Sequence, residues 1–461
     1  EEIEEGLLDS VVSNMQKLGM TEVCKRKLTG ITTDGESANT GKNGGLWVKL
    51  KAYVERDILC VWCVAHRSDL AFSDLEASVS EVRQWRINVK AVASFYRGSA
   101  VRTDELRRIA DESGNQFYRF PEHFEVRFVE HLLNLCESVW KNLLAIRKHW
   151  SHISTEAQNA TRGERATAKG FLKLWEAGGQ QEYLTALMMD LLRLFEKLQK
   201  DCQKSLTTLC DIEAAKACAV ASLSLMEFSP FPGGKEENQN TDTDAVGDTE
   251  RRQVHNSLVT SRRNLTSVRT EIVRSAKEYL SQRLDKDQDD IVKGLQMFLD
   301  ATTAQQMTDA TRARVTGLFG TDCITQYCDE IIGHFVSGKL PAPDTTTTGK
   351  LFHMLKISVP GTIFAKLVQA FLSLTPHSIG PERAVSCHTI LKGPKQSSYS
   401  RDAINSRMYI SLNSGGTAHF DPRPAVAKFL MKKERRVSAP DKELYQSRDF
   451  VKKFFSTDST V

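Results

Sequence analysis

The chain has 461 residues, of which 26% are charged and 40% hydrophobic, a composition typical of a globular protein with two or three hydrophobic cores. Its formal net charge of +4 is too small to indicate nucleic-acid binding by itself, so a basic binding surface would have to be local. The sequence shows no signal peptide and no apolar run of membrane-spanning length. Its 10 cysteines are scattered and do not show the spacing of a disulfide framework, so we expect an intracellular, reducing location without membrane contact.

The N-terminal part is predicted to begin with a helix and a buried strand. Apolar side chains recur at helical spacing from Ile3 to Leu18. Leu28 to Thr33 has the length and composition of a short buried strand, and Asp34-Gly35 closes it as a turn signal. Asp34 is therefore expected at the carboxyl end of a strand, the edge where open α/β sheets place ligand and metal groups.

A second strand is predicted after an intervening helix. Residues from Leu46 to Val54 carry apolar side chains at helical spacing, and Ile58 to Ala65 is an almost continuously apolar run that ends at His66. The unit is thus strand, Asp34, loop, helix, strand and His66. This order delivers a carboxylate and an imidazole near one sheet edge.

The remaining sequence is predominantly helical in pattern. Helices are predicted at 67–98, 105–113, 124–150, 171–198, 205–227, 251–284, 290–299 and 324–336. A polar, Gly- and Asn-rich stretch near 230–250 predicts a mobile loop, and Pro341 to Thr348 predicts a linker. The predicted organisation is an α/β unit at 1–139, an all-helical insertion at 140–340, a compact segment at 351–413 and a polar tail at 422–461.

Two common ligand motifs are incomplete here. Gly35 to Lys42 imitates a phosphate-binding loop, but five residues separate Gly35 from Gly41 where that motif has four, and Asn43 replaces the Ser or Thr that binds magnesium. We therefore expect no nucleotide.

Cys60, Cys63 and His66 offer overlapping metal-binding spacings, yet no second pair follows at the distance of a zinc finger. Zinc is not expected, because buried thiols on a core strand account for the cysteines.

Asp34 has two interpretations. Two-metal phosphoryl chemistry needs two or three carboxylates converging on ions about 4 Å apart, and an aspartate at a strand end suits that geometry. Alternatively, Asp34 is a turn residue, the commonest reason for an Asp-Gly dipeptide. The residues alone leave both interpretations open.

Two segments resemble the hAT (hobo/Activator-type) family of DNA transposases. Thr33-Asp34-Gly35, followed by Cys63-Val64-Ala65-His66, resembles the family's second catalytic strand and its CxxH motif. Pro381 to Ser386 resembles its "ERxFS" element, and Arg401 to Ile410 follows the family's C-terminal pattern. The resemblance implies an α/β fold, mostly helical, in which an RNase H-like core is interrupted by a large all-α insertion.

The resemblance also implies roles for particular residues. Asp34 and Glu382 would be catalytic carboxylates that bind Mg²⁺, while Cys63, His66 and Arg383 would lie beside them. The C-terminal segment would complete the core and form a homodimer. Its expected dimerisation residues are Phe364, Leu367, Val368, Phe371, Leu372 and Met408.

The sequence departs from the family pattern in several places. The family's first catalytic aspartate lies on a strand upstream of a helix like that at 3–18, and neither this strand nor the N-terminal BED-type zinc domain is part of this sequence. Arg127-Phe128 stands where the family has Arg-Trp, and Val385 stands where it has Phe. With one carboxylate missing, we expect that this chain does not cut DNA.

Three functional hypotheses follow. The first is a nuclear, transposase-derived protein that retains dimerisation and DNA binding. The second is a truncated piece of an active transposase, and the third is a helical interaction scaffold without a nucleic-acid role. Lys432 to Arg436 would serve as a nuclear-localisation or phosphate-contacting patch, or only as a solvated tail. The cations of the helix at 251–283 would contact DNA backbone, or form a solvated face.

Overall fold

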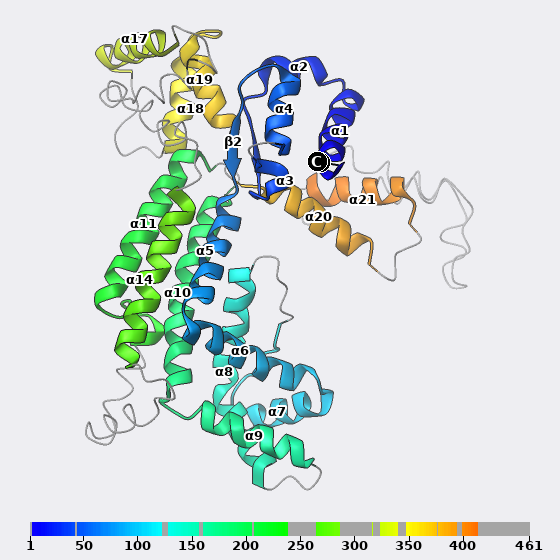
Figure 1. Cartoon of the computed structure of the whole chain (residues 1–461), viewed down its shortest axis with the longest axis vertical. Helices are drawn as coiled ribbons and strands as arrows, with labels where there is room; N and C mark the ends of the chain where they lie inside the picture. The colour runs from blue at the N-terminus through cyan, green and yellow to red at the C-terminus, as the bar shows by residue number, and fades with distance from the viewer. Residues whose placement is uncertain are drawn as a thin grey trace, which may run out of the picture. The chain divides into compact units, whose positions relative to one another are not determined.

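We analysed the fold in a computed structural model of the chain. The structure describes residues 2–41, 44–121, 128–155, 160–204, 207–237, 264–285, 316, 323–339, 347–375, 377–393 and 399–413. Within these ranges the chain is mostly helical and carries one two-stranded sheet (Figure 1). The chain divides into two compact units, Glu1–Ser378 and Ile379–Val461.

The sheet consists of β1 (Gly30–Thr33) and β2 (Leu59–Trp62), which pair in parallel with Ile31 opposite Cys60. β-Branched side chains in β1 and apolar side chains in β2 favour extended backbone. Parallel neighbours need a crossover connection, and α3 (Ser37–Thr40) and α4 (Leu46–Val54) supply it. Because the strands are parallel, both end at the same edge of the sheet.

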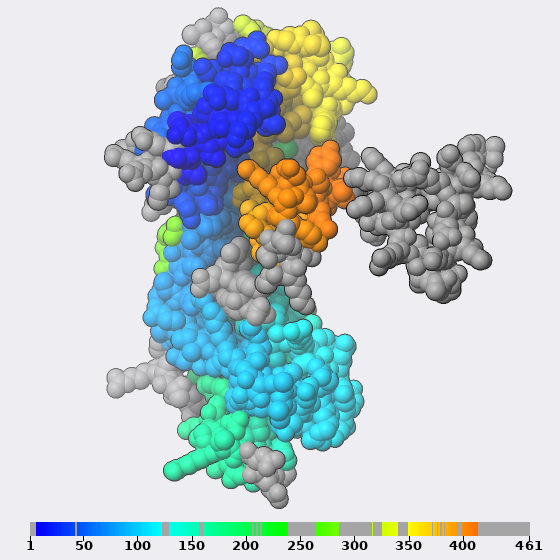
Figure 2. Space-filling view, turned by 90° about the vertical axis from the view of Figure 1, so that its right-hand side faces the viewer, coloured from blue at the N-terminus to red at the C-terminus, as the bar shows by residue number. Residues whose placement is uncertain are grey.

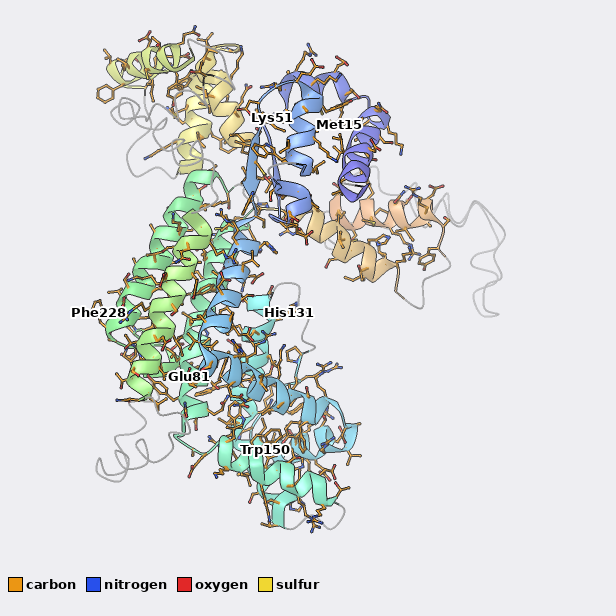
Figure 3. The ribbon with its side chains drawn as sticks, viewed as in Figure 1. Met15, Lys51, Glu81, His131, Trp150 and Phe228 are labelled. Carbon is orange, nitrogen blue, oxygen red and sulfur yellow. The ribbon has the colours of Figure 1, made fainter. Side chains whose placement is uncertain are left out.

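Two N-terminal helices cover α4. They are α1 (Glu2–Lys17) and α2 (Thr21–Lys27). Leu50, Val54 and Ile58 form a small buried core, and Val11 and Met15 of α1 pack against it (Figure 3). This core is separate from the larger one formed by the helices that follow β2.

A group of longer helices builds the larger core. They are α5 (Val64–Ser78), α6 (Ser80–Arg97), α7 (Ala100–Glu112), α8 (Phe128–Thr155), α9 (Arg162–Leu174), α10 (Gln180–Cys202), α11 (Leu209–Phe228) and α14 (Leu265–Asp285). Trp85, Trp150 and Trp175 are fully buried among them. The ring of Trp150 packs on Phe171 of α9, with 4.9 Å between centroids (Figure 3).

Helix α5 connects the sheet to these helices and is held from several sides. Gln199 of α10 donates a hydrogen bond of 2.9 Å to Asp69, whose same oxygen accepts from the amide of Val129 on α8 at 3.2 Å. Arg283 of α14 donates to both carboxylate oxygens of Asp74, at 2.6 and 2.9 Å. Such a bidentate pair fixes orientation as well as distance. The position of α5 is thus tied to α8, α10 and α14 together.

In the last part of the first unit, the described residues form three further helices. They are α17 (Cys323–Val336), α18 (Thr347–Ile357) and α19 (Ile363–Ser373). Phe364 of α19 stacks on Tyr327 of α17, with 5.1 Å between ring centroids. Thr362 caps α19, because its hydroxyl accepts from the amide of Ala365 at 3.2 Å.

The chain after α19 returns to the sheet. The hydroxyl of Thr32 on β1 donates to the carbonyl of Thr375 at 2.5 Å. A Cβ at Gly30 would lie only 2.8 Å from a methyl group of Leu374, so glycine permits this close approach. A segment more than 300 residues downstream therefore packs directly against β1, as the 343-residue separation of the Thr32–Thr375 bond shows.

The second unit is described at α20 (Ile379–Leu391) and α21 (Arg401–Asn413), which pack against each other. Ile404 is buried there. Several large apolar side chains are exposed, namely Val385, Ile390, Tyr409, Ile410 and Leu412.

The structure confirms the predicted order of strand, helix and strand, and corrects several boundaries. The helix predicted at 67–98 is divided into α5 and α6, which meet at Val79. The strand predicted at 58–65 ends at Trp62, because Cys63 already precedes the first turn of α5. The helix predicted at 171–198 is divided between α9 and α10, and Gly178, at φ +70°, lies in the break. In the segment predicted at 351–413, α18 and α19 belong to the first unit.

The mobile loop predicted near 230–250 is only partly described, and its described part is packed. The residues up to Glu237 form a turn and the start of a helix, and the side chain of Glu236 is fully buried. Residues 238–263, the helix predicted at 290–299, most of the predicted linker and the polar tail lie outside the described residues.

A buried polar network anchors this turn to α10 and α14. Asp190 of α10 accepts hydrogen bonds of 2.9 Å from the amides of Lys235 and Glu236. The carboxylate of Glu236 accepts in turn from Arg269 of α14 and, at 2.6 Å, from the hydroxyl of Tyr183. Burial, reinforced by the Glu236 carboxylate, raises the pKa of Tyr183. The turn is therefore held by a charged pair removed from water.

Substituting Glu236→Gln should lower the free energy of unfolding by about 3 kcal/mol, because it leaves Arg269 charged and buried without its counter-ion. Urea denaturation measures this change. The matched control is Glu112→Gln, in an exposed pair with Arg108 whose atoms are 2.6 Å apart; exposed pairs contribute less than about 1 kcal/mol. If both substitutions lower the free energy of unfolding equally, the buried Glu236–Arg269 pair contributes no more to stability than an exposed pair does.

Candidate functional site

The carboxyl edge of the two strands brings together the residues predicted on each. The amide of Cys63 donates to the carbonyl of Thr33 at 2.7 Å, so the residue after β2 is bonded to the last residue of β1. Asp34 follows Thr33 directly, and His66 lies in the first turn of α5. The order strand, Asp34, strand, Cys63 and His66 therefore converges at one end of the sheet, as the sequence predicts.

Asp34 is held by its own loop. Its Oδ1 accepts hydrogen bonds from the amide of Glu36 at 3.1 Å and from the side-chain amide of Asn39 at 2.9 Å. Gly35 has φ +88°, and a Cβ there would lie 3.2 Å from the ring of Trp62, so both the backbone and the space favour glycine. One carboxylate oxygen thus stabilises the turn, while Oδ2 accepts no hydrogen bond from the residues that the structure describes.

Cys63 and His66 occupy different environments. Cys63 is fully buried and precedes α5 as its N-cap residue. His66 is half-buried and has no hydrogen-bonding partner in the described part of the chain. Next to it, Arg67 is buried, and its guanidinium lies 5.5 Å from the ring centroid of Trp62. Around Asp34, the described residues form no cluster of three or more His, Cys, Asp or Glu side chains placed to hold a metal ion.

The other predicted site residues lie farther along the chain. Glu382 and Arg383 are on α20 in the second unit. The side chain of Glu382 lies outside the described residues, and Arg383 is exposed. The structure thus supplies no geometry for a pair of Asp34 with Glu382.

The residues predicted for dimerisation are partly core residues. Phe364, Leu367 and Val368 are fully buried in the first unit, and α19 packs against α17 and α18. Leu372 and Met408 are half-buried, whereas the side chain of Phe371 lies outside the described residues. The apolar stripe of α19 therefore packs within the subunit, because its own neighbouring helices cover it.

Residues 251–263 of the basic helix predicted to contact DNA lie outside the described residues, and the described cations of this helix pair with acidic residues of the same chain. In α14, Arg269 pairs with Glu236, and Arg283 pairs with Asp74. Arg274 and Lys277 both bond to Glu227 on α11. The hydrogen bond from Lys277 is the main cause of the lowered pKa of Glu227. The described cations of α14 thus connect helices of the bundle, and this face is a poor candidate for phosphate contacts.

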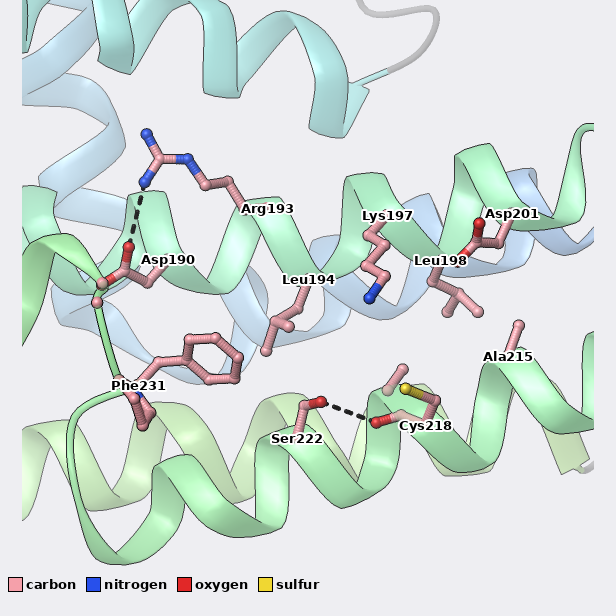
Figure 4. A pocket seen from close by; sticks show the side chains of 14 residues that line it. Asp190, Arg193, Leu194, Lys197, Leu198, Asp201, Ala215, Cys218, Ser222 and Phe231 are labelled. Atoms are coloured by element: carbon pink, nitrogen blue, oxygen red, sulfur yellow. Dashed lines mark hydrogen bonds and ion pairs between the residues drawn. The ribbon is translucent and has the colours of Figure 1, made fainter.

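Two features of the surface were not indicated by any pattern in the sequence. A cavity of about 300 Å³ lies between α10 and α11, where Lys197 extends between the helices and Asp190 pairs with Arg193 at 3.3 Å (Figure 4). A hollow of about 850 Å³ is lined by Arg97, Arg107 and Arg119. No sequence signal identified the hollow, because its arginines come from two helices and the segment after α7.

A cluster of the buried Tyr96 and His149 with the partly exposed Glu105 connects α6, α7 and α8. His149 is fully buried, with Nδ1 at 3.2 Å from the hydroxyl of Tyr96 and Nε2 at 3.0 Å from a carboxylate oxygen of Glu105. Burial lowers the pKa of His149, although Glu105 opposes this shift and the charges of His152 and Arg102 add to it. Burial also raises the pKa of Tyr96. A neutral His149 that donates to Glu105 and accepts from Tyr96 satisfies all three groups, so the cluster serves to hold the helices together.

No protein-family model matches the chain. Among the residues that the structure describes, none of the helices combines the length and apolar character needed to cross a bilayer.

The two substitutions Asp34→Ala and Asp34→Asn should separate the structural role of Asp34 from its charge. Alanine removes both hydrogen bonds to Oδ1 and should lower the free energy of unfolding by about 2 kcal/mol. Asparagine keeps an acceptor oxygen in place and should cost less than half of that. Thermal or urea denaturation measures both values, and equal losses would show that the charge, not the loop hydrogen bonds, stabilises the turn.

The unfolding free energy should depend on pH through His149. Its pKa is lower in the folded state than its ordinary value near 6.5. The unfolded chain therefore binds the extra proton first, and stability present above about pH 6.5 is lost as the pH falls, by at most about 1.4 kcal/mol per pH unit. Urea denaturation between pH 7.5 and 5.5 measures the slope.

His149→Gln should flatten this slope, whatever it does to stability at neutral pH. His388→Gln, on α20 and outside the cluster, is the control and should leave the slope as in the wild type. An unchanged slope in His149→Gln would assign the acid sensitivity to other groups.

Proposed function

We propose that this chain is a transposase-derived, hAT-like protein that binds DNA and self-associates in the nucleus, with Asp34 kept as a remnant carboxylate. The observation that carries the proposal is the parallel pair β1–β2, with Asp34 directly after the first strand and Cys63 and His66 directly after the second. That arrangement supports an RNase H-like core, because both motifs of the resemblance then lie at one sheet edge.

The arrangement of the helices gives further support. The polypeptide leaves the sheet through α5 and continues into the large helical group, which is tied back to α5 by Asp69 and Asp74. The segment at 373–375 then packs against β1. A helical insertion followed by a return of the chain to the sheet is what the resemblance implies. In this proposal the segment after α19 is part of the core.

Self-association is assigned to the second unit. The stripe of α19 is used inside the first unit, whereas α20 and α21 expose the apolar side chains Val385, Ile390, Tyr409 and Ile410. Exposed apolar groups on a two-helix element are typical of a surface that another polypeptide covers. The proposed homodimer therefore uses these helices.

A second candidate function is that of an active transposase fragment, in which Asp34 binds Mg²⁺. One observation favours it, namely that Oδ2 of Asp34 accepts no hydrogen bond from the described residues, while Oδ1 is fixed by Glu36 and Asn39. A carboxylate oriented by one oxygen and open at the other can ligate a metal ion. The third candidate, a helical scaffold without a nucleic-acid role, is favoured by the internal pairing of the α14 cations.

Fluorescence anisotropy of a labelled DNA duplex, titrated with the full chain between 50 and 200 mM salt, tests the proposal. DNA binding should give a negative slope of log Kobs against log[salt], because phosphate contacts release counterions. Light scattering should report a dimer that Ile410→Asp converts to a monomer. Absence of salt-dependent binding would favour the scaffold. Mg²⁺-dependent cleavage of the duplex, lost in Asp34→Asn, would favour the active enzyme.

A further inference from the structure

The surface hollow beside α7 is lined by three arginines. Its walls are formed by the end of α6, one face of α7 and the segment that follows α7, and Arg97, Arg107 and Arg119 come from these three elements. Asp104 is the only acidic residue among its described lining residues. The α6–α7 part of the first unit lies on the face drawn in light blue and cyan in Figure 2. The hollow therefore carries an excess of positive charge.

Arg107 makes two contacts that orient its guanidinium. Its Nη1 donates to Asp104 at 2.8 Å, one turn earlier on α7, and its guanidinium lies 5.2 Å from the ring centroid of Phe117. The side chain is still 53% exposed. A guanidinium has five N–H donors in a planar fork. The contacts to Asp104 and Phe117 orient the group and leave donors facing solvent.

Arg119 stands on an anchored backbone. The buried side chain of Asn142 on α8 accepts from the amide of Tyr118 at 3.1 Å and donates to its carbonyl at 2.7 Å. On the other side, the buried ring of Phe120 stacks on Tyr96 at 5.4 Å. The exposed side chain of Arg119 has no ion-pair partner within the described ranges. The fold thus fixes the backbone at Arg119 and leaves its charge uncompensated.

The length of α7 that lines the hollow suits a short run of phosphates. The face of α7 in the hollow runs from Ala100 to Arg107, which is about 10 Å at 1.5 Å per residue. Phosphates of one strand follow one another at about 3.4 Å along the axis of B-DNA, so this length corresponds to about three phosphates. Ala100 is also the first residue of α7, and the positive end of the helix dipole adds to the same potential.

We propose that this hollow binds the phosphodiester backbone of DNA through Arg97, Arg107 and Arg119. A protein partner fits less well, because the hot spots of protein interfaces combine arginine with large aromatic anchors that a partner can contact. The two aromatic rings in the hollow are unsuited to that role, since Phe117 is covered by Arg107 and Phe120 is buried. The contacts go to the backbone, so they fix position without reading sequence. This inference rests on the proposed DNA-binding function and locates one of its surfaces.

The test uses the full chain with Arg97→Gln, Arg107→Gln and Arg119→Gln, singly and combined, in the anisotropy titration with two duplexes of unrelated sequence. Each single substitution should make the slope of log Kobs against log[salt] shallower by about 0.9, and the triple substitution should make it shallower by about 2.7. Binding should weaken by the same factor on both duplexes. The matched control is Arg108→Gln, on the same helix but paired with Glu112 and outside the hollow. It should bind like the wild type.

The outcomes separate this inference from the proposed function. If the wild type binds DNA and the triple variant binds with the same salt slope, the hollow is excluded as a DNA-binding surface and the DNA-binding function stands. If Arg108→Gln weakens binding as much as Arg119→Gln does, only general surface charge is involved and the hollow is again excluded. If the wild type shows no salt-dependent binding, the proposed function fails together with the hollow. Far-ultraviolet circular dichroism checks that each variant folds. If the triple variant misfolds, the salt slope of the single variant Arg119→Gln, at an exposed residue, decides whether the hollow contacts DNA.

Discussion

The described structure of the first unit depends on how α5 is fixed at its two ends. At its start, the amide of Cys63 bonds to Thr33, so the helix begins where the sheet ends. Toward its far end, Asp74 receives two hydrogen bonds from Arg283 on α14. Between these points Asp69 joins α8 and α10 through a single oxygen. A shift of α5 would break polar contacts to the sheet and to three helices at once, which makes it the rigid link between the small sheet and the helical core.

The sequence predicted the residues at this link because local signals specify them. A short apolar strand closed by Asp34-Gly35, and a second apolar run that leads to His66, need no distant partner to be recognised. The boundary at Trp62 was missed, since Val64 and Ala65 suit a buried strand and a buried helix equally. The stripe on α19 shows the same limit. Its spacing predicts a buried face, but only the three-dimensional structure shows that α17 and α18 cover it.

Asp34 shows why the two interpretations of an Asp-Gly dipeptide need not exclude each other. Its Oδ1 performs the turn role, because it accepts from Glu36 and Asn39. The same two contacts fix the direction of Oδ2, so the turn would also orient a metal ligand. A site that loses the other carboxylates can therefore keep Asp34 for stability alone. The presence of Asp34 therefore fits a remnant of a catalytic site and does not by itself indicate catalysis.

The distribution of charge explains why the basic helix of the sequence and the basic surface of the structure differ. In α14 the spacing of cations suggested a DNA-contacting face, yet Arg269 and Arg283 each meet a carboxylate from a distant part of the chain. Such pairing is long-range and leaves no local signal. In the hollow, by contrast, Arg119 is isolated in the sequence. It lines the same hollow as Arg107 of α7, and Asn142 holds the backbone next to it. With a net charge of only +4 on the whole chain, the proposed nucleic-acid affinity requires a local excess of positive charge. For this reason the proposal places the DNA contacts in the hollow and not on α14.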